Sequence, residues 1–497
     1  MVAALELSGH GHEVVLLERA PAVGGKLRQV QVGSSSSDAG PTVFTLRGVF
    51  DEVFRNAGSR LGEHVRLQPL GILARHAWNG SERLDLHADI ERSAAAIEAF
   101  GGAAEALGYR RFCADARTVY ETLEQPFLRQ PQPSLLGLMR SSGFGGLPGL
   151  LRLKPFTSLW QALGDYFRDP RLRQLFGRYA TYCGSSPWVA PATLMLVPHV
   201  EQQGVWQLEG GMQSLADGLR ALLLARGVRL RCASAVERIR LQGKRVAQLE
   251  ISGGERLDVA AVVVTSDAAA LAAGVYGSEV ARACTRVPAA RRSLSAITWN
   301  MYAPTGGFEL LRHNVFFSPD YEAEFRALAA RRLPDSPTVY VCAQDREAGQ
   351  PPAPGAPERL LCLMNAPANG DQRRYGEQEV SLCLQKTLER LHDCGLQLQP
   401  TTAQQSATTP TDFNRLFPGS GGALYGQATQ GWRSSFNRPG ARTSVRGLYL
   451  AGGSTHPGPG VPMAALSGRH AARCLLQDLG SKRKSPPVAM RGGTSMH

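Results

Sequence analysis

The chain has 497 residues, of which 43% are hydrophobic and 20% are charged, a balance that is typical of globular proteins and excludes an intrinsically disordered chain. It contains no apolar run near the ~18 residues that a membrane-spanning helix needs, so we expect a protein that is soluble or bound to a membrane surface. The net charge of +13 comes without a basic stripe interleaved with aromatic residues, which argues against a nucleic-acid partner and leaves open either a basic face on anionic lipid or a merely arginine-rich surface.

The N-terminal residues predict a helix, a strand and an acidic strand end. Residues 1–8 have a helical pattern that ends at Gly9, and residues 13–17 form a strand that Glu18 closes. An acidic residue at the end of the second strand of a βαβ unit accepts hydrogen bonds from an adenosine ribose, but an exposed strand-end acid has the same signature. The glycine-rich phosphate loop of such a unit is absent before the helix. We therefore expect the first strand and its phosphate loop, on the order of ten residues, to be missing upstream of Met1.

A pair of glycines and a lysine follow the acidic residue. Gly24 and Gly25 let the backbone come close to a cofactor, and Lys26 can meet a phosphate, although this short motif is weak evidence by itself. The serine run over residues 34–37 then predicts a loop tip. The next five residues, DAGPT at positions 38–42, form a turn in which glycine and proline fix the backbone.

The composition changes over residues 71–199. Residues 125–153 are rich in Pro, Gly and Leu and carry three arginines. They form either a lipid-facing or substrate-access segment, or a loop with short helices packed on a domain. Further along, Pro170 at a first helical position predicts that Asp169 caps a helix.

The middle of the chain predicts two layers. Residues 205–215 contain a second glycine pair and lead into a helix, and the strands that follow continue an α/β layer. Residues 291–410 alternate short strands with a longer helix, which indicates a second, mixed layer. The strands of the first layer are expected at 227–230, 235–239 and 259–264, and the longer helix of the second at 377–391.

The stretch from Gly447 to Gly468 predicts a strand, a glycine-rich turn and the start of a helix. The apolar run at residues 448–451 suits a buried strand, and apolar residues recur with a helical period from Met463 onward. This arrangement aims free backbone N–H groups and the positive end of a helix dipole at one point, where an anionic cofactor is the usual occupant. An ordinary tight βα loop is the alternative.

His456, within this turn, is the one candidate for acid–base catalysis, because a neutral imidazole titrates near physiological pH. A purely structural hydrogen bond in a turn beside Pro457 is the alternative. The eleven histidines show no zinc-ligand spacing, and the nine cysteines form no CxxC pair, so we expect reduced thiols and no metal site.

Five motifs are spread along nearly the whole chain: LELSGHGHEVVLLERAPAVGGKL, the DAGPT turn, YFRDPRLRQLF with YATYCGSSPW, GVWQLEGGMQSLADGL and the closing LYLAGGSTHPGPGVPMA. In this order they resemble the carotenoid desaturases of the bacterial phytoene-desaturase type. The closing THPGPGVP is the most specific part, since generic amine oxidases differ there. The variant AGGSTHPGPGVPMA is most similar to the branch that acts on 1-hydroxy- or 1-methoxy-carotenoids such as hydroxyneurosporene.

The resemblance implies an α/β fold in which a Rossmann-like FAD-binding domain, assembled from separated segments, carries an inserted mixed α+β substrate domain. It also implies roles for individual residues. Glu18 would bind the adenosine ribose, and the backbone of Val236 would contact the adenine. The FAD-binding domain would comprise residues 1–70, 200–290 and 415–478, the substrate and membrane-facing domain residues 71–199 and 291–414, and a disordered tail residues 479–497. Gly24, Gly25 and Lys26 would lie near the phosphates, Gly452 and Gly453 along the pyrophosphate and ribityl chain, and Val461, Pro462 and Met463 at the flavin ring.

The function implied by the resemblance is FAD-dependent desaturation at C-3,4 of an acyclic carotenoid, in carotenoid biosynthesis. One hydrogen would leave as a hydride to flavin N5 and the other as a proton. The implied partners are a lipophilic carotenoid, a membrane surface and an electron acceptor that is either oxygen or a quinone. The implied location is cytoplasmic and peripheral on the inner or photosynthetic membrane. A phytoene desaturase, a carotene isomerase and an inactive truncated flavoprotein are the alternatives.

Overall fold

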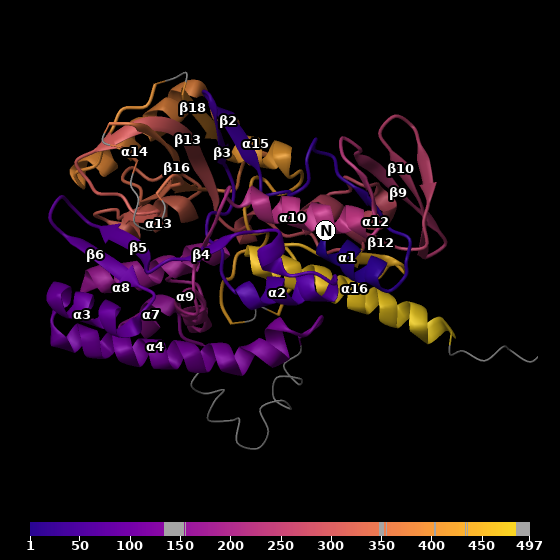
Figure 1. The fold of residues 1–497 in the computed structure, drawn as a ribbon, viewed down its shortest axis with the longest axis horizontal. Coiled ribbons are helices and arrows are strands. Elements are labelled where there is room, and N and C mark those ends of the chain that lie inside the picture. Colours follow the sequence, from indigo (N-terminus) through magenta and orange to yellow (C-terminus); the bar gives the residue numbers. More distant parts are fainter. Residues whose placement is uncertain are drawn as a thin grey trace, which may run out of the picture.

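The structure is a computed structural model that describes residues 1–133, 154, 156–346, 352–353, 355–401, 404–432, 434 and 436–483. Figure 1 shows its two parts, a curled sheet with helices beneath it and a cofactor part around helices α1, α10 and α16. Most of the expected lipid-facing segment and the end of the expected tail, residues 134–153 and 484–497, lie outside the described residues.

The cofactor part contains two small parallel sheets and one antiparallel sheet. β1 pairs with β8 and β12 pairs with β19, both in parallel, while β9, β10 and β11 form the antiparallel sheet. Short strands joined through helices are the expected layout of a segmented α/β layer. Its elements are α1 (Val2–Gly9), β1 (Val15–Leu17), α2 (Arg47–Asn56), α10 (Gln213–Ala225), β8 (Arg229–Arg231), β9 (Val236–Gln242), β10 (Arg245–Ile251), β11 (Arg256–Asp258), β12 (Val262–Val264), α11 (Ala268–Ala272), α12 (Ser278–Ala281), β19 (Leu448–Leu450) and α16 (Val461–Arg483).

The first and last helices of the chain pack against each other, as Figure 1 shows for indigo α1 and yellow α16. Gly468 makes this close approach possible, because a Cβ there would lie 3.2 Å from the backbone nitrogen of Ala3. Arg469, the next residue on α16, forms an ion pair with Glu6 on α1 at 2.9 Å. The C-terminal helix therefore fixes α1 beside the turn in which α16 begins.

The second part is built on an eight-stranded curled sheet. Its strand order is β17-β13-β16-β15-β14-β5-β6, with β18 also paired to β13, and only the β14–β5 pair is parallel. Buried apolar side chains of β13, β15 and β16 pack against α14 on one side of this sheet. Its elements are β5 (Ile72–Ala77), β6 (Arg83–His87), β13 (Ser295–Gly306), β14 (His313–Phe316), α13 (Tyr321–Ala329), β15 (Val339–Ala343), β16 (Pro357–Ala366), α14 (Glu377–Asp393), β17 (Gln397–Leu398), β18 (Gln405–Thr408) and α15 (Pro410–Leu416).

Helices pack beneath the curled sheet around an aromatic core. Phe167 and Phe176 stack at a centroid distance of 4.7 Å, and Phe112 lies 4.8 Å from Phe176. The expected cap is confirmed, because the Asp169 carboxylate accepts a hydrogen bond of 2.8 Å from the backbone of Arg171. These helices are α3 (Ile90–Gly101), α4 (Ala103–Leu123), α7 (Leu159–Leu163), α8 (Pro170–Gly177) and α9 (Leu196–Gln202).

Asp38, buried at the end of β3, joins the two parts. Its carboxylate accepts a hydrogen bond of 2.6 Å from the backbone of Met212, and its carbonyl accepts one of 2.8 Å from Asn300 on β13. Gly211 has to be glycine, because a Cβ there would lie 2.3 Å from that carboxylate. The connecting strands are β2 (Gln29–Val32), β3 (Ser35–Asp38), β4 (Leu67–Pro69) and β7 (Trp206–Leu208).

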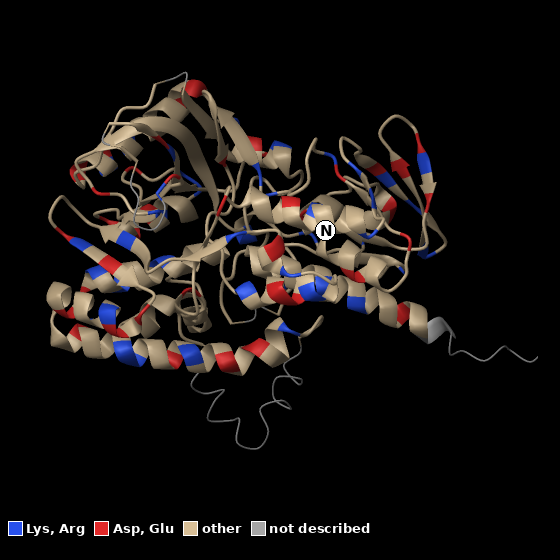
Figure 2. Ribbon diagram, in the orientation of Figure 1, with Lys and Arg blue, Asp and Glu red and all other residues tan. Residues whose placement is uncertain are grey.

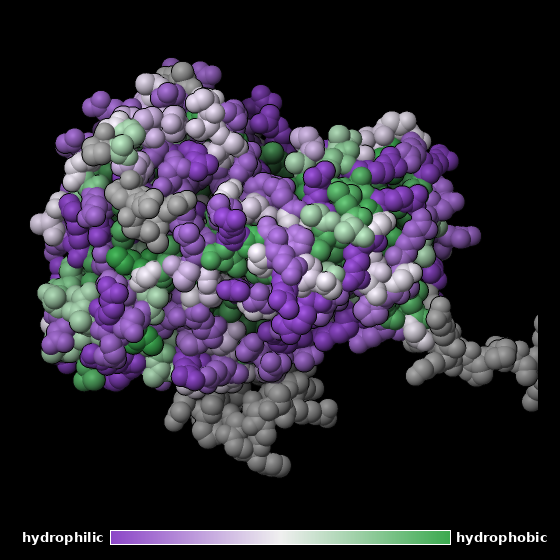
Figure 3. Space-filling view, viewed as in Figure 1, coloured by the Kyte–Doolittle hydropathy of each residue, from purple (hydrophilic) through white to green (hydrophobic). Residues whose placement is uncertain are grey.

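The surface carries both charge signs. Figure 2 shows basic and acidic residues interspersed along α4 and α16, and Figure 3 shows small hydrophobic areas between hydrophilic ones on the same face. Within the described part of the chain, no helix is both long and apolar enough to cross a membrane.

Candidate functional site

One large cavity connects the two parts of the protein. Its volume is ≈ 1980 Å³, whereas pockets for single small ligands measure about 300–1,000 Å³. It is lined mainly by apolar residues, both from the cofactor part and from the helices and curled sheet of the second part. The cavity therefore has room for a large cofactor and an elongated apolar substrate together.

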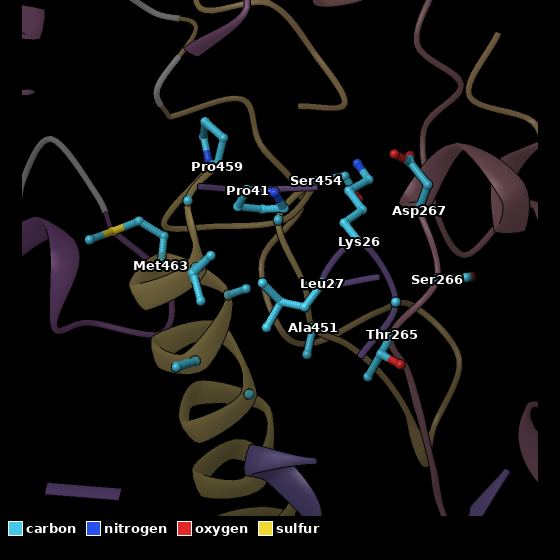
Figure 4. Close-up of a pocket in the computed structure, with 18 of the residues that line it drawn as sticks. Lys26, Leu27, Pro41, Thr265, Ser266, Asp267, Ala451, Ser454, Pro459 and Met463 are labelled. Atoms are coloured by element: carbon cyan, nitrogen blue, oxygen red, sulfur yellow. The ribbon is translucent and has the colours of Figure 1, made fainter. Parts of the chain in front are cut away.

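The turn before α16 forms one wall of this cavity. Val461, Pro462 and Met463 line it at the start of the helix, and Gly452 and Gly453 line it just after β19. Figure 4 shows Met463 and Pro459 on one side of the close-up and Thr265, Ser266 and Asp267 on the other, with Lys26 and Leu27 between them. The positive end of the 23-residue helix dipole is thus at the cavity, where it favours a negatively charged group.

The glycines of this wall leave room for a bound group. A Cβ at Gly453 or at Gly25 would meet no protein atom within 4 Å, although both residues line the cavity. The N–H of Gly452 is already used, since it donates to the Ser467 hydroxyl at 3.1 Å. Open space over two cavity-lining backbones fits the close approach of a flavin cofactor.

The glycine pair near the N-terminus is held in a tight turn by its own backbone. Gly24 has a φ of +130°, and a Cβ there would lie 2.3 Å from the carbonyl oxygen of Leu27. Lys26 donates to the carbonyl of Leu424 and lies over the Phe417 ring at 5.2 Å. Burial lowers the pKa of Lys26 below its usual value. This lysine therefore joins two loops, and its contact with a phosphate stays a prediction.

The adenosine end expected from the sequence lies around β1. Glu18 and Val236 both line the cavity, and the Glu18 carboxylate accepts a hydrogen bond of 2.8 Å from the backbone of Ala20. Met1 and Val2, at the start of α1, line the cavity as well. The structure thus gathers Glu18, Val236 and a helix N-terminus at one cavity, which fits a nucleotide with its phosphates.

The strands beside this region leave two edges open. Among the described residues, β1 pairs only with β8 and β12 pairs only with β19. Residues 14–17 and 260–265 all line the cavity. The space next to these edges is apolar, with Val14, Val263 and Leu475 in its walls.

His456 lies in the turn but does not line the cavity. It is 2% exposed, and its Nε2 lies 3.0 Å from the carbonyl oxygen of Phe127 and 2.9 Å from that of Gln130. Burial lowers the pKa of His456 to about 4, so the imidazole is neutral near pH 7. This geometry favours the structural alternative, in which His456 fixes the segment that follows α4 against the turn.

The sequence reasoning did not identify a polar cluster in the cavity wall. Arg178 and Tyr182 come from the short helix Arg178–Cys183, and Glu201 comes from α9. The spacing of four between arginine and tyrosine is the only sequence signal, and it is common on helix surfaces. Within the described ranges, no group of three or more His, Cys, Asp or Glu residues is placed to hold a metal ion.

Comparisons with known proteins agree with this arrangement. The flavin containing amine oxidoreductase family matches residues 1–476. The chain is 50% identical to a hydroxyneurosporene desaturase of Rubrivivax gelatinosus, over 100% of this chain and 94% of the relative. It is 42% identical to a hydroxyneurosporene desaturase of Cereibacter sphaeroides, over 97% of each chain.

Solved structures share the fold at low sequence identity. An oxidoreductase from Methanosarcina mazei superposes with a TM-score of 0.59 at 16% identity, covering 95% of this chain and 97% of that one. Wild-type putrescine oxidase bound to putrescine gives a TM-score of 0.54 at 12% identity, covering 96% of each chain. The expected α/β fold with a flavin-binding domain and a substrate domain is confirmed. The chain belongs to the flavin containing amine oxidoreductase family and is an FAD-dependent oxidoreductase.

Proposed function

We propose that this protein desaturates an acyclic carotenoid and introduces a C-3,4 double bond into a 1-hydroxy- or 1-methoxy-carotenoid such as hydroxyneurosporene. The observation that carries the proposal is the mainly apolar cavity of ≈ 1980 Å³ that reaches from the start of α16 into the second part. A polyene needs such a long apolar site beside the oxidising group. The names of the relatives at 50% and 42% identity support the same substrate class.

The residues of the chain would bind the carotenoid, exclude water from the cavity and stabilise negative charge on the reduced cofactor. When bound, FAD supplies the two-electron oxidation. The first turn of α16 places a helix N-terminus at the cavity, which stabilises negative charge by about 0.3–1 kcal/mol at an exposed site and by more in a dry one. Val197, Val200 and Leu363 line the cavity with apolar side chains that hold the hydrocarbon and exclude water.

Glu18, Gly25, Val236 and Gly453 would hold the nucleotide and flavin of FAD, and Met463 would face the ring. All five line the cavity. We further propose that a strand and phosphate loop from residues preceding Met1 occupy the space between β1 and β12. The two open strand edges support this part of the proposal, since a parallel strand there would join the two small sheets into one. A version extended upstream should bind FAD more tightly than residues 1–497 alone, and equal affinity would contradict it.

The mouth of the cavity would rest on a membrane. Phe156 is 82% exposed and packs edge-on against Trp432 at 5.7 Å, and both residues line the cavity. Exposed aromatic residues are favoured at lipid interfaces. All nine cysteines are free, as suits the cytoplasmic side of a membrane. In vesicle flotation, Phe156→Ser should bind vesicles less than wild type does. Leu382→Ser removes an exposed apolar residue on α14 that does not line the cavity, and it should bind as wild type does.

The central test is conversion of a defined carotenoid. The FAD-loaded protein is incubated with 1-hydroxyneurosporene in lipid vesicles, and the product should lose two hydrogen atoms and absorb at longer wavelength. Conversion of phytoene instead would indicate a phytoene desaturase. A product of unchanged mass and altered geometry would indicate an isomerase. A protein that binds FAD and converts none of these substrates would refute the proposal.

A further inference from the structure

Three polar side chains interrupt the apolar wall of the cavity. Arg178 is 6% exposed, Glu201 is 5% exposed, Tyr182 is half-buried, and all three line the cavity. They come from two adjoining elements, the short helix Arg178–Cys183 and α9. Their neighbours in the wall include Val197 and Val200, which are apolar.

The hydrogen bonds of this cluster are incomplete. An Nη2–H of Arg178 donates to the Tyr182 hydroxyl at 3.3 Å, and the Tyr179 hydroxyl donates to Glu201 Oε2 at 2.7 Å. Among the described residues, the Nε–H of Arg178 has no hydrogen-bond partner. This Nε is shielded from the cavity, so a ligand would meet the other nitrogens of the guanidinium. A buried charged group in the wall of a binding cavity is costly unless it has partners, which favours a polar group on the ligand.

The short helix that carries Arg178 and Tyr182 ends near the cofactor wall. Gly184, just after the short helix, contacts Tyr425, since a Cβ there would lie 2.8 Å from the tyrosine ring. Gly426, which follows Tyr425, contacts Ser454, since a Cβ at Gly426 would lie 2.6 Å from the Ser454 Cβ. Ser454 follows Gly453 directly, so these contacts link the residue after the short helix to the cofactor turn, and Arg178 lines the same cavity as that turn.

We propose that Arg178, Tyr182 and Glu201 bind the oxygen substituent at C-1 of the carotenoid and thereby select oxygenated substrates. This inference rests on the proposed function, and it names the residues that determine specificity. C-1 is separated from the reacting C-3 only by C-2, so its oxygen has to be bound near the cofactor. Arg178, Tyr182 and Glu201 line the same cavity as the first turn of α16, which fits this requirement.

The chemistry of the three groups distinguishes two oxygenated substrates. The Arg178 guanidinium donates hydrogen bonds, and it can serve the oxygen of a hydroxyl or of a methyl ether. The Glu201 carboxylate accepts, and only a hydroxyl can donate to it. A carotenoid without the oxygen would leave these buried groups unpaired, which is the strongest form of rejection a binding site offers.

The experiment compares three substrates in vesicles with the FAD-loaded protein: 1-hydroxyneurosporene, 1-methoxyneurosporene and neurosporene. Wild type should prefer the hydroxylated substrate over neurosporene by at least about 100-fold in kcat/KM. Arg178→Met should lose about 100-fold on both oxygenated substrates and convert neurosporene at least as well as wild type, because the unpaired donor is gone. Glu201→Met should lose activity on the hydroxylated substrate and keep it on the methoxylated one.

Two controls separate specificity from folding. Arg168→Met removes an exposed arginine just before α8 that does not line the cavity, and it should leave all three values unchanged. The milder Tyr182→Phe should weaken only the oxygenated substrates. Equal loss on all three substrates in Arg178→Met and Tyr182→Phe would overturn the inference. Wild type that desaturates hydroxylated and plain neurosporene equally would overturn it and leave the proposed function standing, while wild type that desaturates neither would overturn both.

Discussion

Two adjacent glycines in the turn before α16 should respond in opposite ways to substitution. A Cβ at Gly453 projects into open cavity, with no protein atom within 4 Å, and its φ lies outside the left-handed region. Gly453→Leu should therefore change the free energy of unfolding of the apo-protein by less than about 0.5 kcal/mol. The added side chain takes space that the flavin needs, and overpacking of this kind costs about 1–3 kcal/mol, or about 5- to 150-fold in the Kd for FAD.

Gly452→Ala is the matched control. Gly452 has a φ of +117°, and its Cβ would lie 3.2 Å from the carbonyl oxygen of Thr265, so alanine is strained there by about 1–3 kcal/mol. Urea unfolding of the FAD-free proteins measures the free energy of unfolding, and quenching of flavin fluorescence measures the Kd for FAD. A Gly453→Leu protein that loses apo stability as Gly452→Ala does, yet binds FAD normally, would refute the assignment of this surface to the cofactor.

Three further substitutions test buried polar groups in or near the cavity wall and elsewhere in the protein. Burial raises the pKa of Glu324 from 4.5 to about 7, so the protonated carboxyl stabilises the fold below pH 4.5 and this contribution is lost as the pH rises through 7. Glu324→Gln should therefore raise the free energy of unfolding by up to about 3 kcal/mol at pH 8.5 and have little effect at pH 4.5. An equal effect at both pH values would contradict this. Lys26→Met should destabilise the apo-protein by about 1–3 kcal/mol in urea unfolding, because the carbonyl of Leu424 loses its donor; unchanged stability would argue for a role with the phosphates alone. His456→Ala should lower the melting temperature and leave the pH profile of kcat unchanged, and the reverse result would restore the catalytic interpretation.

Periodic and glycine-marked segments were predictable from sequence. The helix expected at 377–391 is α14 (Glu377–Asp393), and the strand expected at 448–451 is β19 (Leu448–Leu450), since both have strong local patterns. The loop tip expected at residues 34–37 is confirmed only at Ser34, which lies in the turn between β2 and β3, and was wrong for the rest, because Ser35–Asp38 form strand β3. Serine has low strand propensity, and the strand is held by its pairing with β2 and by a hydrogen bond of 2.8 Å from Asn300 to Ser37. That partner lies 263 residues away, beyond any local signal.

The candidate site shows the same division. Turn glycines such as Gly453 could be predicted as site residues from the sequence, because a backbone that must approach a cofactor excludes side chains. Glu201 could not be predicted as a site residue, because α9 reaches the cavity only through its packing in the second part of the protein. Lys26 was expected near the cofactor phosphates, whereas its hydrogen bond to Leu424 depends on a residue 398 positions away, which no local pattern indicates. A site residue is therefore predictable from sequence where the cofactor constrains the backbone itself. Its hydrogen-bond partners are not predictable when they lie far away in the sequence.

The polar cluster of Arg178, Tyr182 and Glu201 should lower the free energy of unfolding, because its charged groups are buried in an apolar wall. Burial raises the pKa of Glu201 while Arg178 acts in the opposite direction, as expected of two charges that share a dry wall. Arg178 and Glu201 interact through space, each being hydrogen-bonded to a tyrosine. Replacing two buried opposite charges by apolar residues is commonly neutral or stabilising by about 1–4 kcal/mol, whereas removing one leaves the other uncompensated and costs up to about 3–5 kcal/mol. We therefore expect Arg178→Met and Glu201→Met each to be less stable than wild type, and the double variant to be at least as stable, in a cycle measured by urea unfolding. A double variant less stable than both single variants would mean that the cluster serves folding, and the substrate effects of Arg178→Met would then have a structural origin.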